Sequence, residues 1–176
     1  ATAILLVIAV AFLNQGPDWR IMTAEGTGSA IVNGTTLSLS DTRGLERALR
    51  RGGQVSVPEG SQLTLLSPAT LLVQVAPGSE VTVPAPSGRW FRKTMKASVI
   101  RGEARLLTGA NFPGRVMYIE TPAGSTILTG TLVSIATDGT LTCVCVLEGK
   151  AQVGASQKSM EFVPADMRKV MFADKR

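Results

Sequence analysis

Residues that could carry out chemistry are few in this chain of 176 residues, which contains two cysteines and no histidine. Histidine is the commonest general base, the usual partner of a nucleophile and a frequent metal ligand. The carboxylates form no paired acid–base motif, and the glycine-rich turns lack the lysine and serine of a phosphate-binding loop. The sequence therefore favours a binding protein over an enzyme and predicts no catalytic residue and no cofactor.

The two cysteines form a Cys-x-Cys motif. Cys143 and Cys145 flank Val144 in an expected strand, so both point to the same face as Leu141 and Leu147. The functional interpretations are a metal pair and a redox pair. However, the motif alone cannot complete a tetrahedral metal site, and an extended strand holds the thiols too far apart for an easy disulfide. We therefore predict free, buried thiols that pack as small hydrophobic groups and bind no metal.

A basic segment with interleaved aromatic residues, residues 89–96, is the strongest candidate for contact with a partner or a membrane. Tryptophan and arginine are favoured at interfaces, and cations are attracted to anionic headgroups. The alternative is an irregular strand with a solvated basic face. Two further candidates, Trp19 and Arg20, follow the apolar N-terminal run. Together with the segment, the candidate contact residues are Trp19, Arg20, Arg89, Trp90, Phe91, Arg92, Lys93 and Lys96.

An uncharged, almost wholly apolar run occupies residues 1–13. At about 1.5 Å rise per residue it covers about 20 Å of a hydrocarbon core of about 30 Å. We expect residues 1–15 to be the end of a membrane-anchoring helix that continues upstream. A signal-sequence remnant and a buried helix are the alternatives. The helix-breaking residues 14–17, followed by Trp19 and Arg20, suit a single-pass anchor with an interfacial belt.

The rest of the chain, residues 16–176, has the pattern of an all-β domain. Its 18 glycines and 9 prolines, all of which follow the apolar run, supply turns, and apolar residues recur with period two, as in the expected strand at residues 29–36. Residues 41–51 are an exception, because apolar residues at i, i+3 and i+4 follow a capping aspartate and predict a short helix. Asp138-Gly139 predicts a hairpin turn.

An internal repeat indicates the architecture. The segment VSVPEGSQLTL at residues 55–65 recurs as VQVAPGSEVTV at residues 73–83. Each copy predicts two strands joined by a glycine-serine turn, with Gly60 and Gly78 in equivalent turns. Such copies build either a β-solenoid or a two-sheet sandwich of short strands. We expect the apolar residues of both copies to be mostly buried: Val55, Val57, Leu63, Leu65, Val73, Val75, Val81 and Val83.

Three motifs in the second half resemble the FecR domain family. They are YIETPAGSTILTGT at residues 118–131, LVSI at residues 132–135 and DGTLTCVCVLEG at residues 138–149, in the family's order. The resemblance implies a periplasmic all-β domain with a FecR-like fold. FecR proteins combine this domain with a cytoplasmic anti-sigma segment and one transmembrane helix, and relay a signal from an outer-membrane transporter. This sequence shows no cytoplasmic segment before the apolar run.

Two functions are consistent with these features. We favour a non-catalytic, membrane-anchored protein–protein interaction module, namely an accessory subunit that caps a larger membrane complex on its periplasmic face. The alternative is a FecR-type transmembrane signalling regulator. The expected partners are integral membrane proteins and the lipid bilayer, and the expected location is the bacterial inner membrane, with the β domain in the periplasm. Nucleic acid is not expected, because the cations behind the net charge of +5 are spread along the chain without a reader motif.

Overall fold

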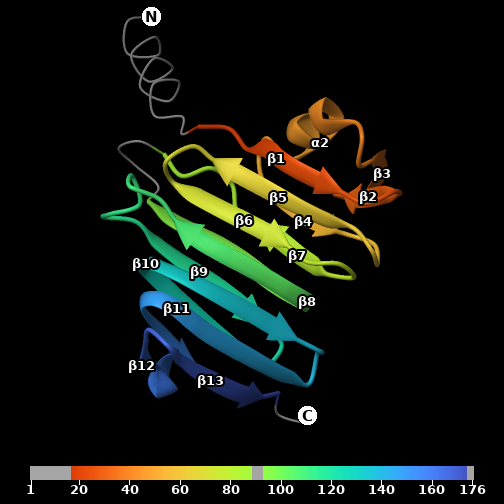
Figure 1. Ribbon diagram of the computed structural model, residues 1–176. Helices are drawn as coiled ribbons and strands as arrows, with labels where there is room; N and C mark the ends of the chain where they lie inside the picture. The colour runs from red at the N-terminus through yellow and green to blue at the C-terminus, as the bar shows by residue number, and fades with distance from the viewer. Residues whose placement is uncertain (1–16, 89–92, 174–176) are drawn as a thin grey trace, which may run out of the picture.

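The structure is a computed structural model that describes residues 17–88 and 93–173. Strands account for 61% of the described residues and form one large mixed sheet of 13 strands (Figure 1), which confirms the predicted all-β class. The elements are β1 (Arg20–Glu25), β2 (Ser29–Val32), β3 (Thr35–Ser38), α2 (Thr42–Ala48), β4 (Gly53–Ser56), β5 (Gln62–Ser67), β6 (Leu71–Val75), β7 (Glu80–Val83), β8 (Thr94–Thr108), β9 (Val116–Thr121), β10 (Gly124–Thr137), β11 (Leu141–Gly154), the 3-10 helix η1 (Gln157–Ser159), β12 (Glu161–Pro164) and β13 (Met167–Phe172).

The expected membrane helix at residues 1–15 lies wholly outside the described residues. Within residues 17–88 and 93–173, no helix has both the length and the apolar character needed to cross a bilayer.

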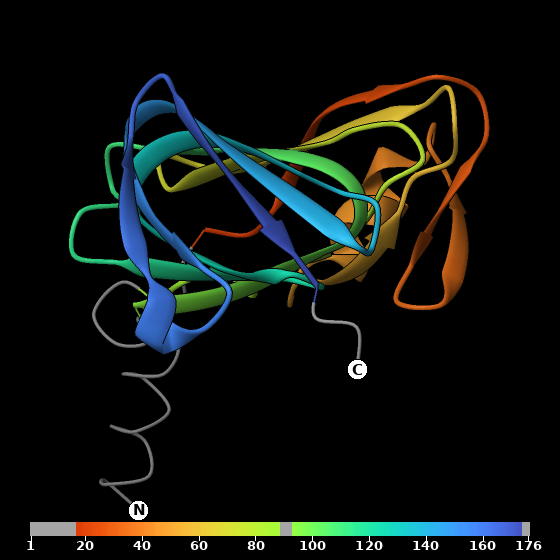
Figure 2. The ribbon, with the colours of Figure 1, turned by 90° about the horizontal axis from the view of Figure 1, so that it is seen from below.

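The sheet folds over on itself into two layers (Figure 2), because three long strands each contribute to both layers. β8 pairs with β7 and β9 before Gly102, and with β6 and β10 after it. β10 and β11 cross between the layers near Gly130 and Gly149. The φ angles of these three glycines are 82°, 150° and 78°, and glycine adopts such values at least cost.

The first layer contains β2, β3, β4, β7, β9 and β12, with the first halves of β8 and β10 and the second half of β11. The second layer contains β1, β5, β6 and β13, with the remaining halves of the three long strands. All pairs of named strands are antiparallel except β8 with β9, which is parallel. The arrangement is therefore a sandwich-like folded sheet, and it lacks the parallel stacking of a solenoid in the part of the chain described.

The internal repeat joins the two layers. In the first copy β4 lies in the first layer and β5 in the second, and the second copy returns from β6 to β7. Gly60 and Gly78 have φ angles of 72° and 67°, which confirms their equivalent turn conformations. The eight predicted apolar residues of the repeat are all buried between the layers. The glycine-serine pair that both copies share therefore forms the turn at which the chain reverses direction.

The helix predicted within residues 41–51 is present as α2, which covers Thr42–Ala48. The Asp41 carboxylate accepts a hydrogen bond from the Gly44 N–H over 2.9 Å, which caps the helix. Leu45 and Leu49 are fully buried and attach α2 to the core. The expected single strand at residues 29–36 is wrong: the chain reverses between β2 and β3, where both turn residues have positive φ.

Two ends of the folded sheet are referred to below. The Pro17 end holds Pro17, Pro68 and Pro113, which line a shallow cavity of about 640 Å³. The opposite end holds Gly102 and the Asp138 turn, where β10 leads into β11.

Candidate partner-binding surfaces

Trp19 belongs to the core, in place of the exposed position expected from the sequence. Its side chain is 2% exposed, and its Nε1–H donates a hydrogen bond to the carbonyl oxygen of Pro84 over 2.9 Å. A buried indole with a satisfied N–H stabilises the fold through a large apolar contact area. Because Pro84 directly follows β7, this contact joins the start of β1 to the segment that leads to the basic residues.

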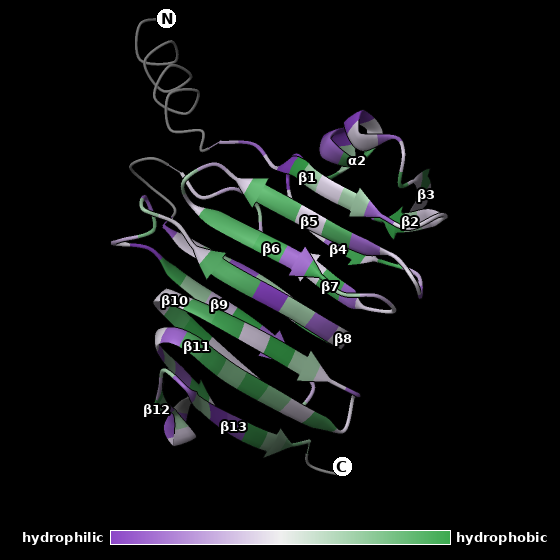
Figure 3. Ribbon diagram, viewed as in Figure 1, coloured by the Kyte–Doolittle hydropathy of each residue, from purple (hydrophilic) through white to green (hydrophobic). Residues whose placement is uncertain are grey.

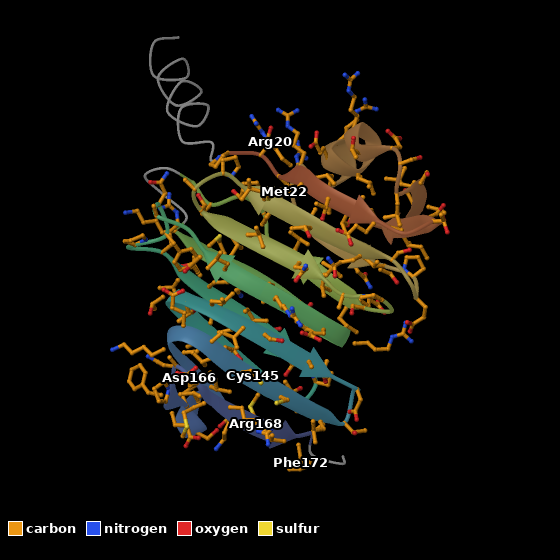
Figure 4. All side chains as sticks on the ribbon, in the orientation of Figure 1. Arg20, Met22, Cys145, Asp166, Arg168 and Phe172 are labelled. Carbon is orange, nitrogen blue, oxygen red and sulfur yellow. The ribbon has the colours of Figure 1, made fainter. Side chains whose placement is uncertain are left out.

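Four exposed arginines gather at the Pro17 end, beside a shallow cavity of about 460 Å³. Arg20 lies on β1, and Arg43, Arg47 and Arg50 follow one another at helical spacing along α2 and the turn after it. Figure 4 shows Arg20 at this end, and Figure 3 shows that α2 contains several hydrophilic residues. Arg20 was among the contact residues predicted from the sequence, whereas the three helix-side arginines were not.

Two acidic residues only partly offset this charge. The Asp18 carboxylate lies 3.7 Å from Nε of Arg50, and both side chains are more than half exposed. Glu46 Oε1 accepts a hydrogen bond from the N–H of Ile21 over 2.9 Å, so this carboxylate links α2 to β1. Exposed guanidinium groups bind phosphate and carboxylate oxygens through paired N–H donors. The arginine cluster is thus suited to an anionic partner.

Half of the predicted basic segment lies outside the described residues, namely Arg89, Trp90, Phe91 and Arg92. Lys93 and Lys96 are described, and both are exposed at the start of β8. Their contact roles stay predictions.

The described flanks of the basic segment are fixed at the Pro17 end by Arg115 and Val116. Arg115 Nε donates to Ser87 Oγ over 2.8 Å, and Arg115 Nη2 donates to the carbonyl oxygen of Gly88 over 3.3 Å. The Val116 N–H donates to the carbonyl oxygen of Lys93 over 3.1 Å. The structure therefore brings the two groups of predicted contact residues, those near Trp19 and those near Lys93, to the same end of the domain.

A row of leucines crosses the outer face of the second layer. Leu66 on β5, Leu72 on β6, Leu107 on β8 and Leu132 on β10 are successive cross-strand neighbours. They are half-buried or exposed, and the Leu107 side chain is 38% exposed. Further along this face, Phe172 on the edge strand β13 is 71% exposed. Contiguous exposed apolar surface marks sites of protein contact.

Cys143 and Cys145 lie on this outer face, so the prediction that they are buried is wrong. Both are free and half-buried, and their sulfur atoms are 3.7 Å apart. They do share a face with Leu141 and Leu147, as predicted, but the buried face of β11 carries the alternate residues, including Val144. Partial burial and the adjacent Cys145 raise the pKa of the Cys143 thiol, while the charge of Arg168 acts in the opposite direction.

Comparison with known proteins gives a likeness in the fold. No model of a known protein family and no curated protein matches the sequence. Two crystal structures of a protein described as a putative anti-sigma factor from Parabacteroides distasonis ATCC 8503 are similar, each with a TM-score of 0.59 and 16% identity. The similarity covers 69% and 70% of this chain and 56% of the other chain, so it spans little more than half of that protein.

Proposed function

We propose that this chain contains the partner-sensing β domain of a FecR-type transmembrane signalling regulator, and that it acts without catalysis. The observation that carries the proposal is the fold likeness to a protein described as an anti-sigma factor. The FecR-like motifs in residues 118–149 support it independently, because they were recognised from the sequence. An accessory subunit of a membrane complex would need the same anchored domain, but neither observation favours that role.

The arginine cluster supports a further part of the proposal, which is that the Pro17 end faces the membrane. The described chain begins at this end with Pro17, which is separated from the apolar residues 1–13 by three residues. A cation close to an anionic bilayer surface contributes about 1 kcal/mol of attraction. Arg20, Arg43 and Arg47 would then lie against lipid headgroups on the periplasmic side of a bacterial inner membrane.

The basic segment is assigned in this proposal to an integral membrane partner. Trp90 and Phe91 would serve as apolar anchors, with Arg89, Arg92, Lys93 and Lys96 around them. The anchor and the domain surface would then act as two linked contacts, so that the first raises the effective concentration of the second.

Transcript profiling distinguishes the regulator from the accessory subunit. In the organism that encodes the chain, the gene is deleted and then restored, and transcripts are compared with those of the parent strain. A regulator changes a small group of transcripts that share one promoter type, and restoration reverses the change. An accessory subunit instead gives loss of a membrane complex on a native gel while no such promoter group responds, and that result would contradict the proposal.

The location of the domain can be tested with its own cysteines, since Cys143 and Cys145 are the only two in the chain and are half-buried. Spheroplasts are treated with a membrane-impermeant maleimide before and after lysis. A periplasmic domain is labelled in intact spheroplasts to the same extent as after lysis. Labelling that requires lysis contradicts the periplasmic location, and the Cys143→Ser/Cys145→Ser variant measures the background.

A further inference from the structure

Cys143 and Cys145 form a dithiol on the outer face of the second layer. Their sulfur atoms are 3.7 Å apart, neither is in a disulfide, and both side chains are half-buried. They occupy adjacent positions on the same face of β11, and Figure 4 shows Cys145 on this strand with Arg168 on the neighbouring β13. The proposed signalling role uses neither thiol.

The neighbouring strands fix the dithiol from both sides. β11 is paired on both sides here: Cys145 lies opposite Ser134 and Arg168, and Cys143 lies opposite Ala136 and Val170. Because the strand is internal to its layer, its backbone cannot shift without breaking two ladders of hydrogen bonds. The neighbours on β10 are small, so the approach to the sulfur atoms from that side is not covered by a large side chain.

The sulfur separation matches the bite of a chelated metal ion. With metal–sulfur bonds of about 2.3 Å, two sulfur atoms 3.7 Å apart subtend an angle of about 107° at the metal. That angle is close to the tetrahedral value, and a modest opening of the pair reaches trigonal geometry. The thiols therefore need little rearrangement to bind one ion together.

The small number of donors selects the kind of ion. The chain has two cysteines and no histidine, and the described residues contain no group of three or more potential metal-binding side chains. Structural zinc requires four protein ligands, whereas thiolates favour monovalent copper, a soft ion that is stable with two or three ligands. A two-thiolate site on an open surface fits monovalent copper best.

The local charge is also suited to a thiolate complex. One monovalent copper ion with two thiolates carries a net charge of −1. Arg168 is exposed directly opposite Cys145 and can compensate this charge. Lys169, the next residue along β13, instead forms an ion pair with Glu161 and offers a matched control.

The 3.7 Å separation of the sulfur atoms departs from the sequence-based expectation that these thiols bind no metal. We propose that Cys143 and Cys145 bind one monovalent copper ion, with the remaining coordination positions open to an external ligand. Binding exchanges two thiol protons for one copper ion, and neither copper nor sulfur changes its oxidation state. Arg168 is a positioning residue that compensates the charge of the complex. The proposal does not depend on the signalling role, so either can fail without the other.

Competition with a chelator tests the site. The reduced full-length protein in detergent, without oxygen, is titrated into monovalent copper held by bathocuproine disulfonate, and loss of the coloured chelate is measured. We expect transfer of one copper ion per chain. Cys143→Ser and Cys145→Ser should each weaken binding by more than about 100-fold, since loss of an outer-shell partner alone costs about 10- to 100-fold. Arg168→Gln should weaken it about 10-fold, and Lys169→Gln should not.

Two controls keep the result decisive. Thermal unfolding of each variant establishes that it is folded, and copper X-ray absorption of the wild-type complex should show two sulfur neighbours. Divalent zinc, offered alone in the same competition format, should bind at least about 100-fold more weakly because two of its four ligands are missing. Failure of the wild-type chain to take copper from the chelator, or retention of copper by the double serine variant, overturns the proposal.

Discussion

The Pro17 end and the outer face of the second layer are both surfaces of the same two-layered core, but their residues differ in kind. At the Pro17 end, the arginine side chains are exposed to solvent while the neighbouring indole of Trp19 is buried. The positive charge therefore lies on the surface, and the apolar contact lies in the core. On the outer face, the thiols and most of the leucines are only half-buried, and Phe172 is exposed. One sandwich thus presents a cationic end suited to anionic groups and an apolar face suited to protein or soft-metal contact.

The largest expected effect is on the free energy of unfolding, which should fall far more when Trp19 is truncated than when Phe172 is. Trp19→Ala removes a 2% exposed side chain and its hydrogen bond to Pro84, so the free energy of unfolding should fall by about 3–5 kcal/mol. Phe172→Ala removes a side chain that is 71% exposed, and the change should stay within about 0.5 kcal/mol. Urea unfolding of the full chain measures both. Equal losses would show that Phe172 belongs to the core.

The next effect concerns the glycines that turn the chain at the end opposite Pro17. At Gly102, with φ of 82°, an added Cβ would lie 2.7 Å from Cα of Ser79. Gly102→Ala should therefore destabilise the fold by about 2–4 kcal/mol, through backbone strain and overpacking together.

Gly139→Ala is the matched control, because φ is 96° but no atom lies within 4 Å of the added Cβ. Only the strain remains, so the loss should be about 1–2 kcal/mol. If both variants lose the same stability, the close approach of β8 to Ser79 does not contribute.

Local patterns predicted the parts of the fold that depend on local geometry. The repeat identified equivalent turns at Gly60 and Gly78 because backbone conformation alone requires glycine there. The helix was predicted because Asp41 and the spacing of Leu45 and Leu49 are visible in the sequence. The Asn33-Gly34 hairpin also carried a clear signal, which the strand interpretation of residues 29–36 overlooked.

Features that depend on packing between distant segments were not predictable in this way. Both faces of β11 are apolar in sequence, so alternation could not show that Val144 points inward and Cys143 and Cys145 outward. Trp19 was interpreted as interfacial because it follows the apolar run at residues 1–13, whereas its hydrogen-bond partner is the distant Pro84. The arginine cluster joins Arg20 to α2 only through the tertiary fold.

A smaller effect should come from charge at the Pro17 end. If this end faces lipid, Arg43→Glu with Arg47→Glu should reduce partitioning of the full chain onto anionic vesicles by at least about 30-fold, since each cation contributes about 1 kcal/mol. Arg101→Glu with Lys158→Glu makes the same change in net charge and should have little effect. Flotation assays at low salt measure partitioning. A similar loss for both pairs would indicate that only the overall charge matters.

The smallest expected effect is at the hairpin turn between β10 and β11. The Asp138 carboxylate accepts hydrogen bonds from the N–H groups of Leu141 and Thr140, each over 2.8 Å, and from the Thr140 hydroxyl over 2.9 Å. These bonds lower the pKa of Asp138 below its ordinary value of 3.8. A lowered pKa in the folded state stabilises the fold above the ordinary pKa, and this contribution is lost as the pH falls through the folded value.

Asp138→Asn keeps an acceptor oxygen but removes the charge, so it should lower the melting temperature slightly at neutral pH. The difference from the wild type should shrink as the pH falls below 3.8, where the wild-type carboxyl takes up its proton. Thr140→Val removes one of the three donors and should give a smaller deficit with the same pH trend. Melting curves at constant ionic strength make the comparison. A deficit that does not change with pH would mean that the shape of the turn, and not the carboxylate charge, accounts for the effect.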